Sequence, residues 1–284
     1  MGGDTPTEFS PLARAIGKAH SVIFTFQGLR PLAEGQGLYE AWAVKARDTI
    51  SLGRFNINDA GMPVDENGVP IERFTSLDKN IDKAIGMLIT IQSPTSIPDR
   101  PSAAQILQGT VDKSVAHLTV PAPNGIEEAG GFYRVFTPTD GPDTNEASGL
   151  WAISADGTPS LSLSGTTQGF LYEHFIFINN VTVFMGRFSA TDQPDSANLS
   201  SGEQPAPSVP GEDFLQNPPM GLEFPADLSG ARLIVTLEPR IGDQLAPSQL
   251  VVLEAILPAG LKGGETIVLT NRTAEFPTAT ALVF

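Results

Sequence analysis

The sequence predicts an all-β protein made of two related sandwich units in tandem. A hairpin pattern, Leu-Tyr-Glu with a following aromatic residue and then Gly-Arg-Phe, occurs at residues 38–55 and again at 171–188, with matching residues 133 positions apart. Short apolar stretches recur about every 10 residues, and none has the periodicity of an amphipathic helix. The 28 Gly and 24 Pro residues supply frequent turns. Together these observations predict an internal duplication of a β unit.

Length and charge limit the classes of function. A chain of 284 residues is long enough for two domains with well-filled cores. Its 17 Lys and Arg residues face 32 Asp and Glu residues, which argues against a nucleic-acid partner or an anionic lipid surface. Because cysteine is absent, disulfides, thiol nucleophiles and cysteine-based zinc sites are excluded.

Residues 1–18 are polar and are predicted to form an amino-terminal tail or lead-in strand. No apolar run is long enough for a transmembrane segment, and the first residues lack the charged and apolar regions of a signal peptide. A short polar start also remains when an export signal or lipid-anchor segment has been removed. A membrane tether through such a segment is therefore the alternative to a freely soluble chain.

The first unit is predicted to span residues 19–140 and the second residues 141–284. Alternating or continuous apolar residues predict strands in both. In the first unit they cover residues 21–26, 38–44, 50–55, 87–92, 117–120 and 132–136. In the second they cover residues 150–153, 160–165, 171–177, 181–188, 233–239, 266–269 and 278–284.

The offset between the copies rises from 133 to 146 at Thr90 and Thr236, so the second copy carries 13 extra residues. They fall in a Pro-rich stretch near 202–215, which has the composition of a surface loop. With about seven short strands in each copy, we expect two tandem Ig-like antiparallel β-sandwich units. The alternative is one fused sandwich in which residues 132–136 or 150–153 cross between the halves.

Charged and aromatic residues recur within the repeated hairpin. Folding each hairpin about its turn places Glu40 opposite Arg54 and Glu173 opposite Arg187, as cross-strand ion pairs that fix register. The aromatic residues are expected to fill the two cores, and an exposed aromatic platform is the alternative. They are Tyr39, Trp42, Phe55, Tyr172, Phe175 and Phe188.

No pattern predicts catalysis or a cofactor. The three histidines lack partners at metal-ligand spacing, and neither a nucleophile elbow nor a phosphate-binding loop occurs. Two acidic loops, one containing Asp59 and Asp65 and the other Asp140 and Asp143, offer the oxygen ligands that calcium uses. We expect either solvated turns or a structural calcium ion there.

The inserted loop breaks the symmetry of the two copies. It ends in Glu212, Asp213 and Phe214, which are candidates for an interaction loop because long loops on rigid sandwiches often carry function. A plain tolerated insertion is the alternative.

The recurring residues resemble a known family. Tyr-Glu-X-aromatic on one strand, Gly-Arg-Phe on the next, and an apolar strand that ends in Thr236-Leu237-Glu238-Pro239 are similar to the extracytoplasmic domain of anti-sigma-K factors. The resemblance implies a non-enzymatic domain at the periplasm, the cell surface or outside the cell, which acts through contacts with another envelope or extracellular protein. The chain departs from that family because it carries the domain twice, without a sigma-binding region or a membrane span.

Two other functions stay open on the sequence alone. A carbohydrate-binding or adhesive cell-surface protein would need an exposed row of aromatic residues, such as Trp42 or Trp151. An enzyme with its site between the repeats would need carboxylates that converge across the interface.

Overall fold

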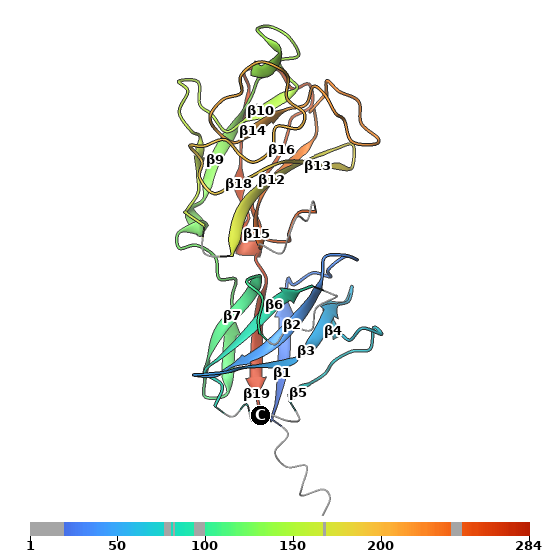
Figure 1. The fold of residues 1–284 in the computed structure, drawn as a ribbon, viewed down its shortest axis with the longest axis vertical. Coiled ribbons are helices and arrows are strands. Elements are labelled where there is room, and N and C mark those ends of the chain that lie inside the picture. The colour runs from blue at the N-terminus through green and yellow to red at the C-terminus, as the bar shows by residue number, and fades with distance from the viewer. Residues whose placement is uncertain (1–19, 77–80, 82, 94–99, 167–168, 240–245) are drawn as a thin grey trace, which may run out of the picture.

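The computed structural model describes residues 20–76, 81, 83–93, 100–166, 169–239 and 246–284, so the predicted tail at residues 1–18 lies outside it. The predicted all-β class is confirmed, because the described elements are strands apart from short 3-10 helices. These helices are η1 (Ile126–Glu128), η2 (Pro138–Asp140) and η3 (Thr273–Glu275). Within the described chain, no helix has the length and apolar character needed to cross a membrane. The strands build two units, stacked along the long axis of the molecule (Figure 1).

The first unit is a nine-stranded sheet in the order β4-β3-β2-β6-β7-β8-β19-β1-β5. The sheet curls so far that strands near its two ends share one aromatic cluster. The Phe55 ring contacts the Phe26 and Phe74 rings, with centroids 5.3 Å apart in both pairs. The strands are β1 (His20–Gln27), β2 (Leu38–Val44), β3 (Thr49–Ile57), β4 (Pro63–Val64), β5 (Phe74–Ser76), β6 (Gly86–Gln92), β7 (Gln105–Asp112), β8 (Val115–Leu118) and β19 (Thr278–Val283).

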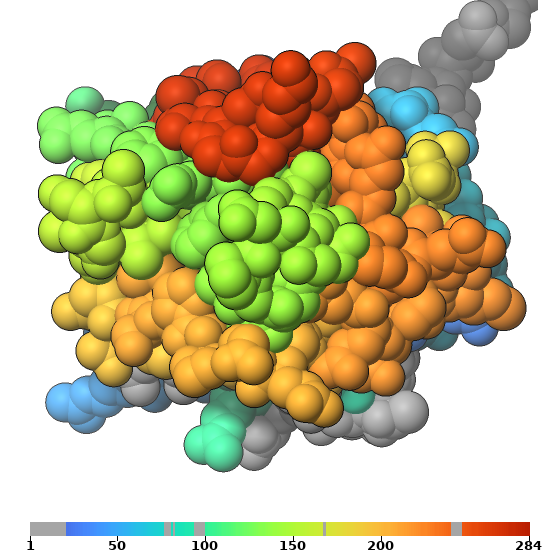
Figure 2. Space-filling view, turned by 90° about the horizontal axis from the view of Figure 1, so that it is seen from above, coloured from blue at the N-terminus to red at the C-terminus, as the bar shows by residue number. Residues whose placement is uncertain are grey.

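The second unit packs two smaller sheets face to face. One has the order β13-β12-β15-β16-β18, and the other contains β11, β9, β10, β14 and β17. The strands are β9 (Gly130–Val135), β10 (Gly149–Trp151), β11 (Leu161–Ser162), β12 (Phe170–Ile178), β13 (Val181–Phe188), β14 (Gly211–Asp213), β15 (Arg232–Pro239), β16 (Val251–Ile256), β17 (Thr266–Val268) and β18 (Thr270–Asn271). Figure 2 looks onto the outer end of this unit, where the segments around residues 140 (light green), 220 (orange) and 265 (red) meet.

The two hairpins have the same strand register. Tyr39 lies opposite Phe55 in β2–β3, and Tyr172 lies opposite Phe188 in β12–β13. Each hairpin also has a bulge after the third pair, between Ala41 and Trp42 in one and between His174 and Phe175 in the other. The next strand pairs, β6–β7 and β15–β16, also match. Each has a register shift just before a threonine, Thr90 in one and Thr236 in the other.

One strand of each predicted unit lies in the other unit. Residues 132–136 were expected to close the first unit, but β9 pairs with β10, β11 and β17 of the second. Residues 278–284 were expected to close the second unit, but β19 pairs with β1 and β8 of the first. The sequence left open whether residues 132–136 stay in the first unit or cross to the other half. The pairing of β9 shows that they cross. The two units have therefore exchanged their last strands.

Within the residues that the structure describes, the chain passes from one unit to the other before β9 and after β18 (Figure 1). The Asn271 side chain ties the two crossings together, because its Nδ2 donates to the carbonyl oxygens of Ile126 at 3.1 Å and Ala129 at 2.9 Å. Buried apolar side chains of both units belong to one contiguous cluster. The junction is therefore a packed and hydrogen-bonded part of the fold.

The repeated tyrosine gives a direct test of the predicted core. Tyr172 exposes 1% of its surface, stacks on Phe188 with centroids 5.9 Å apart, and donates from its hydroxyl to the carbonyl oxygen of Ser164 at 2.9 Å. Tyr172→Ala should lower the free energy of unfolding by about 3–5 kcal/mol because it leaves a large cavity. Tyr172→Phe should cost only about 1 kcal/mol, the hydrogen bond alone. Urea unfolding of both variants checks this, and an unchanged midpoint for Tyr172→Ala would contradict the core assignment.

Candidate functional site

A cavity of about 290 Å³ lies at the junction, with walls from both units. This volume is at the small end of the range for small-molecule sites. The first unit contributes Arg30, Pro31, Leu32, Gln36, Ile91 and Ile106. The second contributes Glu173, Phe177, Arg187, Arg232, Ile234, Glu238, Pro239 and residues 246–251. We call this space the junction cavity.

Arg30 is held at the junction cavity through its backbone. Its amide donates to Gln249 Oε1 at 2.8 Å, and its carbonyl oxygen accepts from the Tyr39 hydroxyl at 2.9 Å. Gln249 Nε2 closes the ring by donating to the Tyr39 hydroxyl oxygen at 2.7 Å. Burial raises the pKa of Tyr39 well above its usual value, so the phenol stays protonated and can donate. A glutamine of the second unit and a tyrosine of the first thus hold the backbone of Arg30, which is an exposed residue.

Two other arginines line the same cavity, each beside a carboxylate. Arg187 Nε on β13 donates to Glu173 Oε1 on β12. Arg232 Nε on β15 donates to Glu254 on β16, and its guanidinium lies 5.1 Å from the centre of the Phe177 ring. Stacking and pairing hold these planar groups in fixed orientations.

Glu238 adds a titratable group to the cavity wall. Its Oε1 accepts from the Ser248 amide at 2.6 Å and from the Thr236 hydroxyl at 2.7 Å. Burial raises the pKa of Glu238 to about 7, and the negative charge of Glu173 acts in the same direction. Glu238 can therefore act as a hydrogen-bond donor or as an anion near neutral pH.

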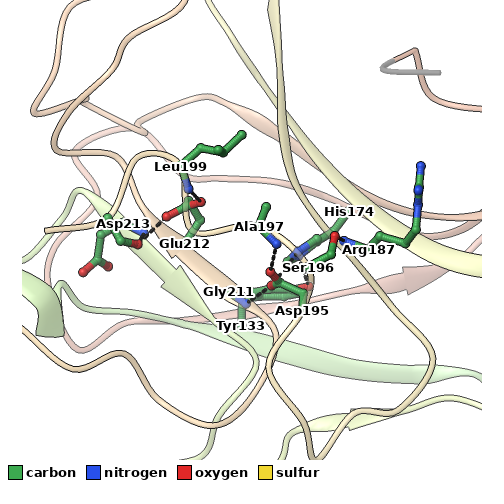
Figure 3. Close-up of polar contacts among 11 residues, drawn as sticks. Tyr133, His174, Arg187, Asp195, Ser196, Ala197, Leu199, Gly211, Glu212 and Asp213 are labelled. Carbon is green, nitrogen blue, oxygen red and sulfur yellow. Dashed lines mark hydrogen bonds and ion pairs between the residues drawn. The ribbon is translucent and has the colours of Figure 1, made fainter. Parts of the chain in front are cut away.

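A second polar cluster lies inside the second unit (Figure 3). The Tyr133 hydroxyl and His174 Nδ1 are 2.9 Å apart, and His174 Nε2 is 3.0 Å from Asp195 Oδ2. Tyr133 comes from β9 and His174 from β12, so the contact joins the two sheets. Burial raises the pKa of Tyr133 well above its usual value, and the charge of Asp195 raises it further. The phenol therefore stays protonated, and hydrogen bonds join it to the His174 ring and the ring to the Asp195 carboxylate.

This order of groups resembles a proton relay, but Tyr133 and His174 expose none of their surface to a substrate. Its evident effect is to anchor the loop that follows β13. Asp195 also accepts from the amides of Ala197 and Gly211, both at 2.9 Å. Gly186 makes room for this carboxylate, since a Cβ there would lie 2.3 Å from Asp195 Oδ1.

Two further buried carboxylates lie in β14, where the same loop ends. Glu212 accepts from the Leu199 amide at 3.1 Å and from the Ser201 hydroxyl. Asp213 accepts from the Thr139 amide at 2.9 Å and from Trp151 Nε1 at 2.7 Å. We call Asp195, Glu212 and Asp213 the carboxylate clasp.

The expectation that the inserted loop ends in an interaction surface is wrong. Glu212, Asp213 and Phe214 expose at most 1% of their surface, and the first two lie in β14, which pairs with β10. These three side chains therefore lie inside the second unit and not on a contact loop.

The clasp gives stability a defined pH dependence. Burial raises the pKa of Glu212 from 4.5 to about 7 in the folded protein. The folded state therefore holds this proton more tightly, and its contribution is complete below pH 4.5 and is lost as pH rises through 7. Glu212→Gln should flatten the fall in melting temperature over this interval. The control is Glu203→Gln, which removes the same charge from an exposed residue of the same loop. It should leave the fall in melting temperature unchanged.

The predicted ion pairs occupy opposite positions on their hairpins. Glu40 Oε2 is 3.2 Å from Arg54 Nε, and Glu173 is paired with Arg187. Only the second pair reaches the junction cavity. All six repeated aromatic residues, Tyr39, Trp42, Phe55, Tyr172, Phe175 and Phe188, are buried.

The acidic residues proposed for calcium are not brought together. Asp65 Oδ1 accepts from the backbone amides of Asn67 and Val69, which makes it part of a turn. Asp140 Oδ2 accepts from Asn145 Nδ2 at 2.8 Å. Among the described residues, no group of three or more His, Cys, Asp or Glu side chains is placed to hold a metal ion. Asp59 and Asp143 take no part in such a group.

The groups that the structure brings together had weak signals in the sequence and were missed there. His174 occupies the strand position that Ala41 occupies in the first hairpin, and an ionisable residue on a buried strand was the available signal. Arg30, Gln249 and Asp195 lie in loops without a local pattern, so only the tertiary structure identifies them.

Comparison of the chain with protein-family models, with curated proteins and with solved structures gives no match. The function of the chain must therefore be inferred from the geometry of the junction cavity and the carboxylate clasp.

Proposed function

We propose that the chain is a non-enzymatic, extracytoplasmic interaction or sensing module built from two Ig-like units of common origin. The resemblance to the outer domain of anti-sigma-K factors implies this role, with another envelope or extracellular protein as the partner. We propose a lipid-anchored or secreted form.

Local agreement between the units supports a common origin. Beyond the hairpin registers and bulges, Ser102 Oγ donates to the Ile91 carbonyl oxygen at 2.6 Å, and Ser248 Oγ donates to the Leu237 carbonyl oxygen at 2.9 Å. Both pairs are related by the offset of 146. Side-chain hydrogen bonds of this kind are not required by a β-sandwich in general, so their recurrence favours duplication over convergence.

The junction cavity is the observation that carries the proposal of sensing. Its walls come from both units. Gln249 of the second unit bonds to Arg30 and Tyr39 of the first. Any occupant of this space therefore contacts both units and favours one relative placement of them. A change of placement is what a partner protein on the surface can detect.

The carbohydrate-binding alternative depended on an exposed tryptophan row. Trp42 and Trp151 expose 1% and 2% of their surface, and both indole nitrogens donate to buried side chains. These two residues therefore do not offer a stacking platform, and no observation favours this alternative over the interaction module.

Affinity capture from a native cell-envelope fraction tests the proposal. The full chain is used as bait beside Gln249→Ala, which removes the bridge, and Gln204→Ala, an exposed control position. We expect a protein that the wild type and Gln204→Ala retain and that Gln249→Ala retains less, with mass spectrometry as the readout.

Retention of polysaccharide alone, or of nothing, would contradict the interaction module. Equal retention by all three baits would show that binding of the partner does not depend on the junction. That result would contradict a role in sensing.

A further inference from the structure

We propose that the outer end of the second unit docks a basic partner protein, with Met220 as the apolar anchor and nearby carboxylates that select positive charge. The inference rests on the proposed function in taking the partner to be a protein, and it adds the docking surface and the charge of that partner. We call residues 137–148 and 214–229, together with Leu199, the outer surface. Figure 2 looks onto this end, where the two segments meet (light green and orange).

Met220 is the most exposed large apolar side chain that the structure describes. It exposes 98% of its surface, and Val268, the next, exposes 71%. Single apolar residues on a surface are ordinary, but Leu199 is a second one here and exposes 62%. Its carbonyl oxygen accepts from Asn217 Nδ2 at 2.8 Å, which joins it to the loop of Met220. Methionine is enriched at protein interfaces because its flexible thioether adapts to the pocket of a partner.

The backbone that carries Met220 is fixed before any partner binds. Pro218 and Pro219 precede Met220, and their rings restrict φ. The Leu222 amide donates to the Pro219 carbonyl oxygen at 3.1 Å, which closes a turn, and Gly221 supplies the φ of 95° that this turn needs. An anchor on a fixed backbone loses less conformational entropy on binding than one on a free loop, which favours affinity.

Hydrogen bonds join the loop of Met220 to the acidic segment before β10. The Ser148 hydroxyl donates to the Ala226 carbonyl oxygen at 2.8 Å, and the Ala226 amide donates to the Phe214 carbonyl oxygen at 3.0 Å. The Phe224 ring packs edge-on against the buried Phe214 ring, with centroids 5.9 Å apart. The two segments therefore form one connected surface on the core of the second unit.

The charge of the outer surface selects a positively charged partner. Its two segments contain five carboxylates and no Lys, Arg or His. A surface of one sign attracts the opposite sign and repels its own, so a second copy of this acidic chain and an anionic lipid surface are both disfavoured. The occupant that fits is a protein patch with an apolar pocket for Met220 and Lys or Arg side chains beside it. The carboxylates are those of Asp140, Asp143, Glu146, Glu223 and Asp227, all at least partly exposed.

The test measures binding of the protein that the wild-type chain retains from the envelope fraction, after that protein has been purified. Titration calorimetry with full-chain variants gives each Kd. Met220→Ser should weaken binding about tenfold, as loss of an interface anchor does. Met62→Ser is the matched control, because Met62 exposes 47% of its surface in the first unit, and it should leave Kd unchanged. Retention alone does not support the outer surface, whereas a difference between these two variants does.

A second pair of variants tests the charge of the partner. Glu223→Gln should weaken binding about threefold at about 50 mM salt, and about 300 mM salt should weaken binding of the wild type and shrink this difference. Glu66→Gln removes an exposed carboxylate from the first unit and should leave Kd unchanged at both salt concentrations. Equal melting temperatures of all four variants show that the changes act on binding and not on folding.

Equal Kd values for Met220→Ser and the wild type, or binding that tightens as salt is added, would overturn the docking surface and leave the interaction module in place. If the wild-type chain retains no protein, the interaction module and this surface both fall. A loss of binding in Met220→Ser with full binding in Gln249→Ala would support the outer surface and remove only the role of the junction in sensing.

Discussion

Deleting residues 278–284 is expected to unfold the first unit and to leave the second unit folded. The deletion removes β19, which lies between β1 and β8, so two inner strand edges lose their partner at once. It also removes the Ala279 and Ala281 side chains from the core. The lost ladder and core contacts cost on the order of 5 kcal/mol, comparable with the whole stability of a small domain.

Backbone amide NMR spectra recorded during thermal unfolding measure the loss of each unit, because the resonances of the two units can be counted separately. We expect the dispersed signals of the first unit to collapse while those of the second persist. A synthetic peptide of residues 277–284 should restore the first unit when added in trans. The same peptide with Ala281→Asp is the control and should fail, since it would place a charge in a fully buried position.

If the truncated chain keeps the signals of both units, β19 is dispensable and the strand exchange has no energetic weight. If both units unfold together, the contiguous core couples them more tightly than strand pairing alone predicts.

Replacing Asp195 should destabilise the second unit by about 3–5 kcal/mol, as expected when one partner of a buried, charged network is removed. Asp195→Leu deprives His174 Nε2 and the amides of Ala197 and Gly211 of their acceptor. Each buried donor then pays its desolvation cost without compensation. The loop that follows β13 also loses its attachment to the sheets.

Urea unfolding gives the free energy, and hydrogen exchange of the Ala197 and Gly211 amides reports on the loop directly. Asp195→Asn keeps one acceptor oxygen and should cost less than Asp195→Leu. Asp192→Leu, an exposed neighbour in the same loop, should be nearly neutral. Equal stability of Asp195→Leu and Asp192→Leu would show that the clasp is not a structural anchor.

The local structure could be predicted from the sequence wherever one strand meets its neighbour in the chain. The repeated Gly-Arg-Phe segment and the alternation around Tyr39 and Tyr172 are sufficient for both hairpins and for the Glu–Arg pairs across them. Each bulge also lies beside a glycine of the repeated Gly-Arg-Phe segment. Gly53 and Gly186 adopt φ of 120° and 148° there. These features depend on residues a few positions apart.

Pairing between distant strands was not predictable in the same way. Residues 132–136 and 278–284 have similar alternation, and nothing in that alternation specifies which edge each strand joins. The exchange therefore depends on the path of the crossings and on contacts such as that of Asn271. Likewise, the Tyr133, His174 and Asp195 cluster brings together three elements that are far apart in the chain.

The exchanged strands also determine the order in which the protein can be completed on the ribosome. Val22, near the start of the described chain, pairs with Val283 of β19, near its end. Every strand of the second unit is synthesised before β19, so that unit can fold while translation continues. The first unit must keep the edges of β1 and β8 open until β19 has been synthesised, and it completes its sheet last although its residues emerge first.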